Sequence, residues 1–139
     1  MQNSLVDAGP IIAWLNRKDS HRARAKPFLD RWGGNLLTTW PVLTEACALL
    51  PEHLRVPLVR WVERGGAQVF ELPANTARQL ADLMSKYRDH PMDLADASLV
   101  WLADQIGLTD VITVDDADFA TYRTATGKAF RNLLPARRK

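Results

Sequence analysis

Apolar positions along this chain follow two spacings, one typical of amphipathic helices and one of short buried strands. The pattern is clearest over residues 91–119. Apolar residues recur at helical spacing from Leu94 to Ala103, with Pro91 just before them and Gly107 just after, the usual asymmetry of a helix. The β-branched run of residues 111–114 comes next and is typical of a strand covered on both faces. The stretch therefore predicts a helix followed by a buried strand.

The same alternation extends over the rest of the chain. Ser20, Thr39 and Asn75 are expected to be N-caps, and Pro27 is expected to kink or break its helix. Strands that alternate with helices at this spacing imply right-handed βαβ units and a parallel sheet, hence an α/β protein. The other predicted strands are 4–6, 36–38, 68–72 and a short last one within 129–134, and the other helices are 10–15, 20–32, 39–50, 54–64 and 75–89.

Composition places the chain among ordinary globular proteins. A length of 139 residues predicts a single domain over residues 1–139, and a hydrophobic fraction of 47% supplies enough apolar side chains for one core. The apolar runs are too short to cross a bilayer, and no signal peptide precedes the first strand, so we expect a cytoplasmic protein without membrane contact. Cys47 is the lone cysteine, which excludes an internal disulfide, and it is expected in the core.

The net charge of +2 is unevenly distributed. One basic cluster spans Arg17 to Lys26, and a second lies near the C-terminus. A cationic periphery suits a protein that binds a polyanion, although solvated basic faces are also common. The three histidines show no paired spacing for a metal and are expected at the surface: His21, His53 and His90. The C-terminal basic residues are Arg123, Lys128, Arg131, Arg137, Arg138 and Lys139.

Carboxylates concentrate at the ends of the apolar elements. Asp7 follows the first predicted strand and Asp115 follows the fourth, while Glu45 is the only acid on the apolar helix 39–50. Helix capping and turns explain many aspartates without any function, so each acid taken alone is ambiguous. The six candidate acids, five near such ends and Glu45 within an apolar helix, are Asp7, Glu45, Asp93, Asp96, Asp115 and Asp118.

The expected topology brings four of these acids, Asp7, Glu45, Asp96 and Asp115, toward one edge of the sheet. Carboxyl ends of parallel strands meet there, and ligands of open α/β sheets bind at that edge. Carboxylates placed so closely raise one another's pKa unless a cation neutralises them, and oxygen ligands favour Mg²⁺ or Mn²⁺. Such a site suits phosphoryl chemistry. The sequence lacks a dinucleotide fingerprint, a Walker loop and a nucleophile elbow, which disfavours those three classes of enzyme.

Four segments in order, LVDAGPIIAWL, LTEACALL, MDLADASLVWLA and VITVDDADF, resemble the PIN-domain family, in particular the VapC-type ribonuclease toxins of toxin–antitoxin pairs. The resemblance covers essentially the whole chain. It implies a three-layer α/β/α sandwich with about five parallel strands, Mg²⁺- or Mn²⁺-dependent cleavage of RNA, a homodimer and a cognate antitoxin.

The resemblance also implies roles for individual residues. Thr113 would help to order the site, and Asp116 would be a surface position. Asp93 and Asp118 would be additional acids that bind a second ion or a water molecule. The catalytic and metal-binding acids would be Asp7, Glu45, Asp96 and Asp115.

Two other functions remain as alternatives. A phosphatase of the haloacid dehalogenase type needs a second aspartate two residues after the first, where this chain has Gly9. A catalytically inert PIN-like scaffold that binds RNA or protein is the other alternative, and such domains usually lose acids that this chain keeps.

Overall fold

A computed structural model describes residues 1–136 and contains a five-stranded parallel sheet in the order β3-β2-β1-β4-β5. Every pair of neighbouring strands is parallel, as predicted. The predicted basic residues Arg137, Arg138 and Lys139 lie outside the described residues. The strands are β1 (Asn3–Val6), β2 (Asn35–Thr39), β3 (Gln68–Phe70), β4 (Asp110–Ile112) and β5 (Arg131–Asn132).

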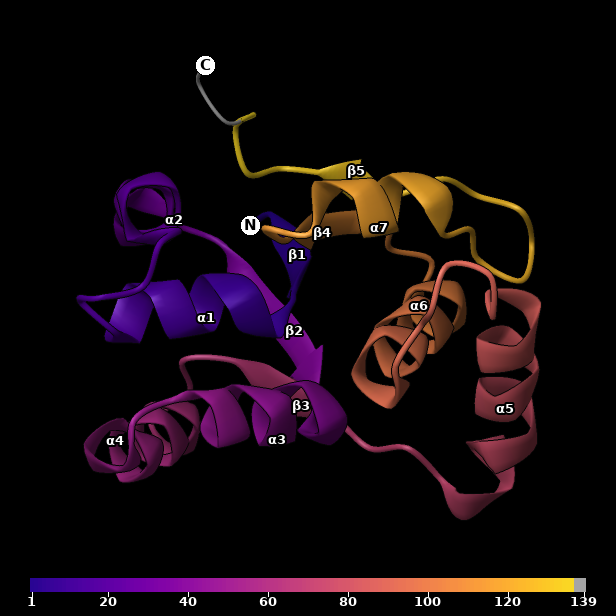
Figure 1. The fold of residues 1–139 in the computed structure, drawn as a ribbon, viewed down its shortest axis with the longest axis horizontal. Helices are drawn as coiled ribbons and strands as arrows, with labels where there is room; N and C mark the ends of the chain where they lie inside the picture. The colour runs from indigo at the N-terminus through magenta and orange to yellow at the C-terminus, as the bar shows by residue number, and fades with distance from the viewer. Residues whose placement is uncertain (137–139) are drawn as a thin grey trace.

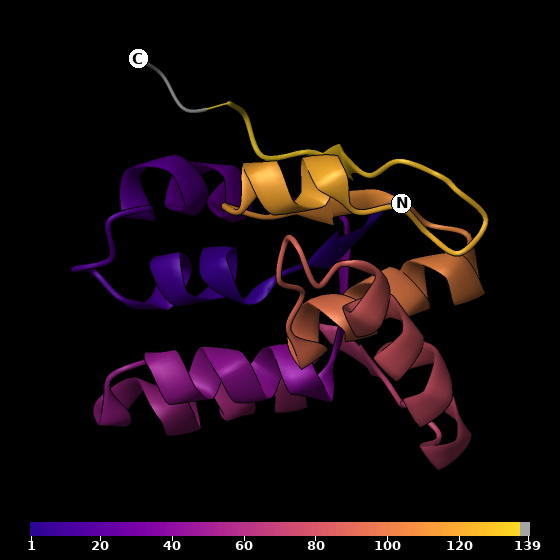
Figure 2. The same cartoon turned by 45° about the vertical axis from the view of Figure 1, so that its right-hand side comes forward.

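Helices cover the sheet on both sides, which confirms the predicted three-layer arrangement. The chain moves outward from β1 to β3 and then crosses back to β4, and right-handed crossovers in opposite directions place helices on opposite faces. Figure 1 shows α1–α4 on its left side and α5 and α6 on its right, and Figure 2 shows the same groups turned. The helices are α1 (Ala8–Leu15), α2 (Arg22–Arg31), α3 (Trp40–Leu49), α4 (Glu52–Glu63), the 3₁₀ turn η1 (Ala74–Thr76), α5 (Ala77–Lys86), α6 (Leu94–Ile106) and α7 (Asp116–Thr121).

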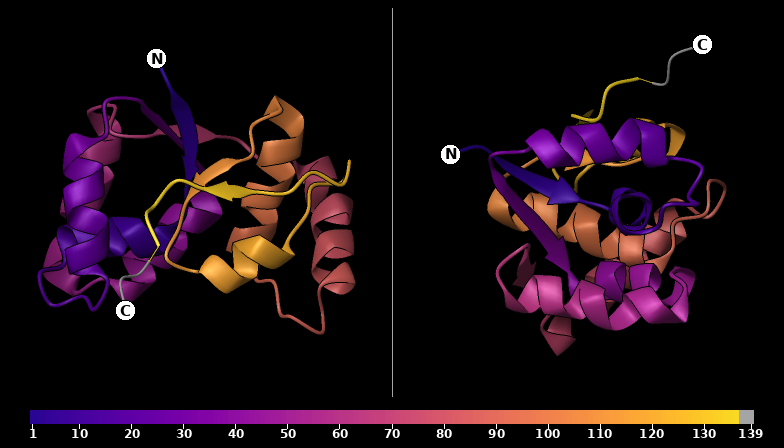
Figure 3. Two further views of the ribbon diagram at one scale, coloured as in Figure 1. Left: turned by 90° about the horizontal axis from the view of Figure 1, so that it is seen from above. Right: turned by 90° about the vertical axis from the view of Figure 1, so that its left-hand side faces the viewer.

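The direction of strand order reverses between β1 and β4. Leu5 pairs with Val111 and Val6 with Ile112, and all four side chains are fully buried. A crevice forms outside the carboxyl ends of strands at such a switch point, because the chains leave the sheet in opposite directions. Figure 3 shows β1 and β2 running in the same direction toward this edge. The edge beyond Val6 and Ile112 is therefore where a ligand site is expected.

Helix α6 passes through the interior and is buried along most of its length. Leu99 and Val100 are fully enclosed, and Gly107 ends the helix in the left-handed conformation, with φ of 68°. No helix among residues 1–136 is both long and apolar enough to cross a membrane. The helix predicted between Pro91 and Gly107 is thus confirmed, and Asp96 in its first turn is buried.

Two predicted helix starts were wrong. The first helix begins at Ala8 instead of Pro10, because Asp7 caps it by accepting a hydrogen bond from the backbone N–H of Ala8. The second helix begins at Arg22 and has no side-chain cap, so Ser20 does not cap it. The cap that Asp7 provides directly after β1 therefore sets the start of α1.

Other local predictions also fail for identifiable reasons. Pro27 does not break helix α2, because exposure of the proline and of Ala23 lets water satisfy the carbonyl that loses its partner. Thr39 occupies the N-cap position of α3, but its hydroxyl lies 2.6 Å from the Ser98 hydroxyl instead of capping the helix. Asn75 lies inside η1 and caps nothing. The short helix α7 was not predicted at all.

Candidate active site

Asp7 is fixed where β1 meets β4. Its carboxylate is 2% exposed, and it accepts hydrogen bonds from the N–H of Ala8 at 2.8 Å and from the hydroxyl of Thr113 at 2.9 Å. Burial, together with the nearby charge of Asp115, raises the pKa of Asp7 from 3.8 to about 7, against the lowering effect of the two donors. A buried carboxylate that hydrogen bonds orient is suited to hold a cation.

Thr113 connects two of the acids. It is fully buried, and its Oγ1 donates to Asp7 while accepting a hydrogen bond from the backbone N–H of Asp115 at 3.0 Å. One hydroxyl therefore sets the distance between the carboxyl end of β1 and the segment after β4. The resemblance implied that Thr113 helps to order the site, and this role stays a prediction.

The N-terminal turn of α6 contributes two further acids. Asp93 is the N-cap of α6 and accepts a hydrogen bond from the N–H of Asp96 at 2.8 Å. Asp96 is 8% exposed, and its Oδ2 accepts a hydrogen bond from the hydroxyl of Tyr122 at 3.2 Å. Burial, followed by the charges of Asp7 and Asp93, raises the pKa of Asp96 to about 7. Asp96 and Asp7 thus influence each other across the sheet edge.

Glu45 and Asp115 complete this group. Glu45 on α3 is half-buried, and burial together with the charge of Asp93 raises its pKa from 4.5 to about 7. Asp115 follows β4, and burial together with the charge of Asp118 raises its pKa. The structure therefore gathers four acids from four separate elements, which are Asp7, Glu45, Asp96 and Asp115, and we call them the acid cluster.

Asp118 has a partner that the sequence did not indicate. Its Oδ1 lies 2.6 Å from Nε2 of His90, which belongs to the loop before α6. His90 was expected to be an ordinary surface residue, and no local pattern marks it as the partner of a residue on α7. Tyr122 was missed for the same reason, since its hydroxyl meets Asp96 only after the chain has folded. Long-range pairs of this kind leave no periodic signal.

The donor set of the acid cluster fits a hard divalent ion, because it consists of carboxylates whose mutual repulsion a cation would relieve. The side chains of the acid cluster are less closely grouped than the ligands of a complete metal site. Among residues 1–136, no three histidine, cysteine, aspartate or glutamate side chains are grouped closely enough to hold an ion. The acid cluster therefore fits a divalent ion by the chemical type of its ligands and by their place at the edge of the sheet.

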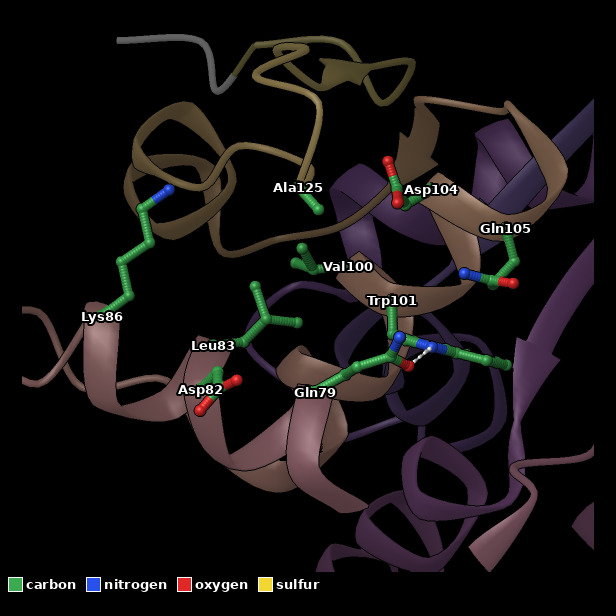
Figure 4. A pocket seen from close by; sticks show the side chains of 9 residues that line it. All are labelled: Gln79, Asp82, Leu83, Lys86, Val100, Trp101, Asp104, Gln105 and Ala125. Atoms are coloured by element: carbon green, nitrogen blue, oxygen red, sulfur yellow. Dashed lines mark hydrogen bonds between the residues drawn. The ribbon is translucent and has the colours of Figure 1, made fainter. Parts of the chain in front are cut away.

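A separate pocket of about 250 Å³ lies between α5 and α6 and does not include the acid cluster. Figure 4 shows the indole of Trp101 with its Nε1 directed at Gln79, to which it donates a hydrogen bond of 2.8 Å. Asp82, Lys86 and Asp104 at this pocket carry charges of both signs. This pocket therefore has no clear preference for a charged ligand.

Comparison with known proteins identifies the family. The model of the PIN domain family matches residues 4–124, which is most of the chain, and the chain belongs to this family. It is 23% identical over 130 residues to ribonuclease VapC26 of Mycobacterium tuberculosis, covering 91% of this chain and 96% of that protein. These matches confirm the resemblance that the four sequence segments indicated.

A solved structure shows the same fold. The crystal structure of VapC20 from M. tuberculosis, described as a toxin that cleaves the sarcin-ricin loop, superposes with a TM-score of 0.73 at 17% sequence identity. The match covers 84% of this chain and 94% of VapC20. The sheet of five parallel strands between helices is thus the fold of a PIN domain.

Proposed function

We propose that this protein is a divalent-metal-dependent endoribonuclease, the toxin of a toxin–antitoxin pair. The observation that carries the proposal is the convergence of four carboxylates from β1, α3, α6 and β4 at the carboxyl edge of the sheet. Membership of the PIN-domain family supports it, as do a relative named as a ribonuclease and a structural neighbour described as a toxin that cleaves the sarcin-ricin loop.

The acid cluster would hold Mg²⁺ or Mn²⁺, with Asp93 and Asp118 as additional ligands, directly or through water. A bound ion would help a water molecule to lose its proton and would neutralise charge that develops on the phosphate. The protein's own groups orient the carboxylates: the N–H of Ala8 and the hydroxyl of Thr113 hold Asp7, and the hydroxyl of Tyr122 holds Asp96.

The reaction that suits this arrangement is hydrolysis of a phosphodiester. Attack of a water oxygen on phosphorus breaks the bond to the 3′ oxygen, and the departing 3′ oxygen takes up a proton. The expected products carry a 5′-phosphate and a 3′-hydroxyl. Exposed Arg17 and Lys18, in the loop before α2, are candidates for contacts with the RNA backbone, so added salt should weaken binding.

We also propose a cognate antitoxin protein as a binding partner and a homodimer as the functional form, on the ground of family membership. The antitoxin would be recognised by its ability to suppress cleavage by the purified protein.

Incubation of the purified protein with total cellular RNA tests the proposal. Discrete fragments should form with Mn²⁺ or Mg²⁺ and should be lost with EDTA and in the Asp7→Asn and Asp96→Asn variants. Asp104→Asn is the matched control, because Asp104 lies on the same helix as Asp96 but its carboxylate accepts a hydrogen bond from Thr126, away from the cluster. Cleavage at the wild-type rate by both cluster variants would reject this site.

Thermal unfolding with Mn²⁺ separates the enzyme from the inert scaffold. A cation that binds only the folded state raises Tm by mass action, so the wild-type protein should gain stability that Asp96→Asn loses. Absence of both RNA fragments and metal-induced stabilisation would favour the scaffold that binds without cutting.

A further inference from the structure

Asp116 follows directly after Asp115 and has an unusual number of partners for a half-exposed carboxylate. The guanidinium of Arg24 binds both of its oxygens at 2.8 Å, and Nδ2 of Asn132 donates to Oδ1 at 2.9 Å. Bidentate arginine–carboxylate pairs restrict geometry as well as charge. Asp116, the first residue of α7, lies at the surface as expected, but its side chain is held in one position.

The side chain of Asn132 is fully used in binding this segment. Its Nδ2 also donates to the carbonyl of Thr113 at 3.0 Å, and its Oδ1 accepts from the N–H groups of Thr113 and Leu134 at 3.2 and 3.1 Å. The amide thus pairs with the backbone of residue 113 as a neighbouring strand would, one step beyond the short ladder between β4 and β5.

Arg24 connects this segment to two distant parts of the chain. It lies on α2, its side chain is 13% exposed, and its Nε donates to the carbonyl of Pro135 at 2.8 Å. The hydrogen bond from Arg24 lowers the pKa of Asp116, so the carboxylate stays charged and the pair stays formed at neutral pH. Helix α2, the start of α7 and the segment after β5 are therefore held together by one side chain.

We infer that Arg24, Asp116 and Asn132 are positioning residues that fix the place of Asp115 in the acid cluster. Asp115 lies between Thr113 and Asp116, and the network holds both of these neighbours. Asp7 and Asp96 each receive a hydrogen bond from a hydroxyl, whereas this network acts on Asp115 through its backbone. The inference rests on the proposed function, because it assigns the network to the same site.

Amide hydrogen exchange tests the positioning without any need for RNA. Asn132→Ala should speed exchange of the Thr113 and Asp115 amides, because both are hydrogen-bonded within the held segment. Arg131→Ala is the matched control: Arg131 is the preceding residue on β5, and its partner is Asp110 in an exposed ion pair. The control should leave exchange of both amides unchanged.

Cleavage kinetics test the consequence for the site. Asn132→Ala, Arg24→Ala and Asp116→Ala should each lower kcat and raise the Mn²⁺ concentration for half-maximal activity about tenfold, the scale typical of residues that orient metal ligands. KM for RNA should stay unchanged. The Arg24→Ala/Asp116→Ala double variant should lose no more activity than the more impaired of the two single variants, because both residues act through one ion pair. Asp116→Asn retains an oxygen acceptor for Asn132 and should recover part of the activity.

Folded Arg24→Ala and Asn132→Ala variants with wild-type kcat and wild-type Mn²⁺ dependence would overturn the inference. If Asn132→Ala does not fold, the two variants at Arg24 and Asp116 carry the same test, because neither residue belongs to the buried core. A wild-type protein that neither cleaves RNA nor gains stability from Mn²⁺ would instead overturn the proposed function. The exchange measurement needs neither property, so the two failures are distinguishable.

Discussion

The hydroxyl of Thr113 donates a hydrogen bond to Asp7 over 2.9 Å, although the two residues are 106 positions apart in the sequence. The bond joins the carboxyl ends of the two strands between which the sheet order reverses. Both residues are buried, so water cannot replace a lost partner. The geometry of the acid cluster therefore depends on a threonine as well as on carboxylates.

Replacement of Thr113 by valine should destabilise the protein and impair cleavage. The Asp7 carboxylate and the Asp115 amide would each lose a partner, and an unsatisfied buried polar group typically costs about 1–3 kcal/mol. Denaturant unfolding measures the loss. Thr113→Ser, which keeps the hydroxyl, should retain most of the stability, and Thr121→Val on exposed α7 should change it little. Equal stability of the valine and serine variants would contradict this role.

Tyr122→Phe should lower cleavage more than it lowers stability. The phenyl ring keeps its packing against the rings of Tyr87 and Phe119, while Asp96 loses the hydroxyl that orients it. Loss of one such hydrogen bond costs about 1 kcal/mol of stability. Tyr87→Phe is the matched control, since its hydroxyl accepts a hydrogen bond from the N–H of Arg123 away from the acids. Similar cleavage by the two variants would show that orientation of Asp96 by Tyr122 is unimportant.

The metal-free protein should lose stability as the pH rises from about 4 to about 7. The pKa values of Asp7, Glu45 and Asp96 are raised to about 7 by folding, so the folded state holds more protons than the unfolded state in this window. Stability gained by proton uptake is therefore present at low pH and is lost as these groups ionise. Thermal unfolding in EDTA at about pH 5 and about pH 7.5 measures it.

Mn²⁺ should reverse this trend, because a cation binds the ionised acids and competes with protons. The rise in Tm caused by Mn²⁺ should be larger at about pH 7.5 than at about pH 5. Asp7→Asn should show a smaller loss of metal-free stability with rising pH than the wild-type protein. A metal-free Tm that rises across this window would contradict the assignment of raised pKa values.

Gly9→Ala should destabilise the protein by about 1–3 kcal/mol, the usual cost of overpacking. A Cβ at position 9 would overlap Cγ2 of Val114, which immediately precedes Asp115. The Gly9→Ala/Val114→Ala double variant should regain stability, because the smaller side chain leaves room. Calorimetric unfolding of the two variants distinguishes this local overlap from a general effect on α1. The contact also explains why the second aspartate of a phosphatase of the haloacid dehalogenase type could not stand at position 9.

The sequence was informative where a residue's role follows from its place at the end of an element. Asp7 and Asp115 follow buried apolar runs, and parallel strands place both at one edge, so their proximity was predictable. Helix α7 escaped prediction because six residues are too few to show a helical period, and its aspartates are equally common in turns.

Pairs between distant segments could not be predicted. Arg24 and Asp116 are 92 positions apart, and His90 and Asp118 are 28 apart. Each of these residues taken alone is an ordinary charged or polar residue with no periodic context. Their pairing depends on how α2, α7 and the loop before α6 pack, which is decided by tertiary structure. The acids were therefore predicted, and the residues that orient them were not.

Strand β1 is made well before its partner β4, which is encoded more than a hundred residues later. A chain emerging from the ribosome lacks Asp115 and the strand that places it until residue 115 has been made. Chains that terminate before this residue therefore carry no complete acid cluster. For a protein proposed to cut RNA, this order of synthesis delays activity until β4 and the residues after it have been translated.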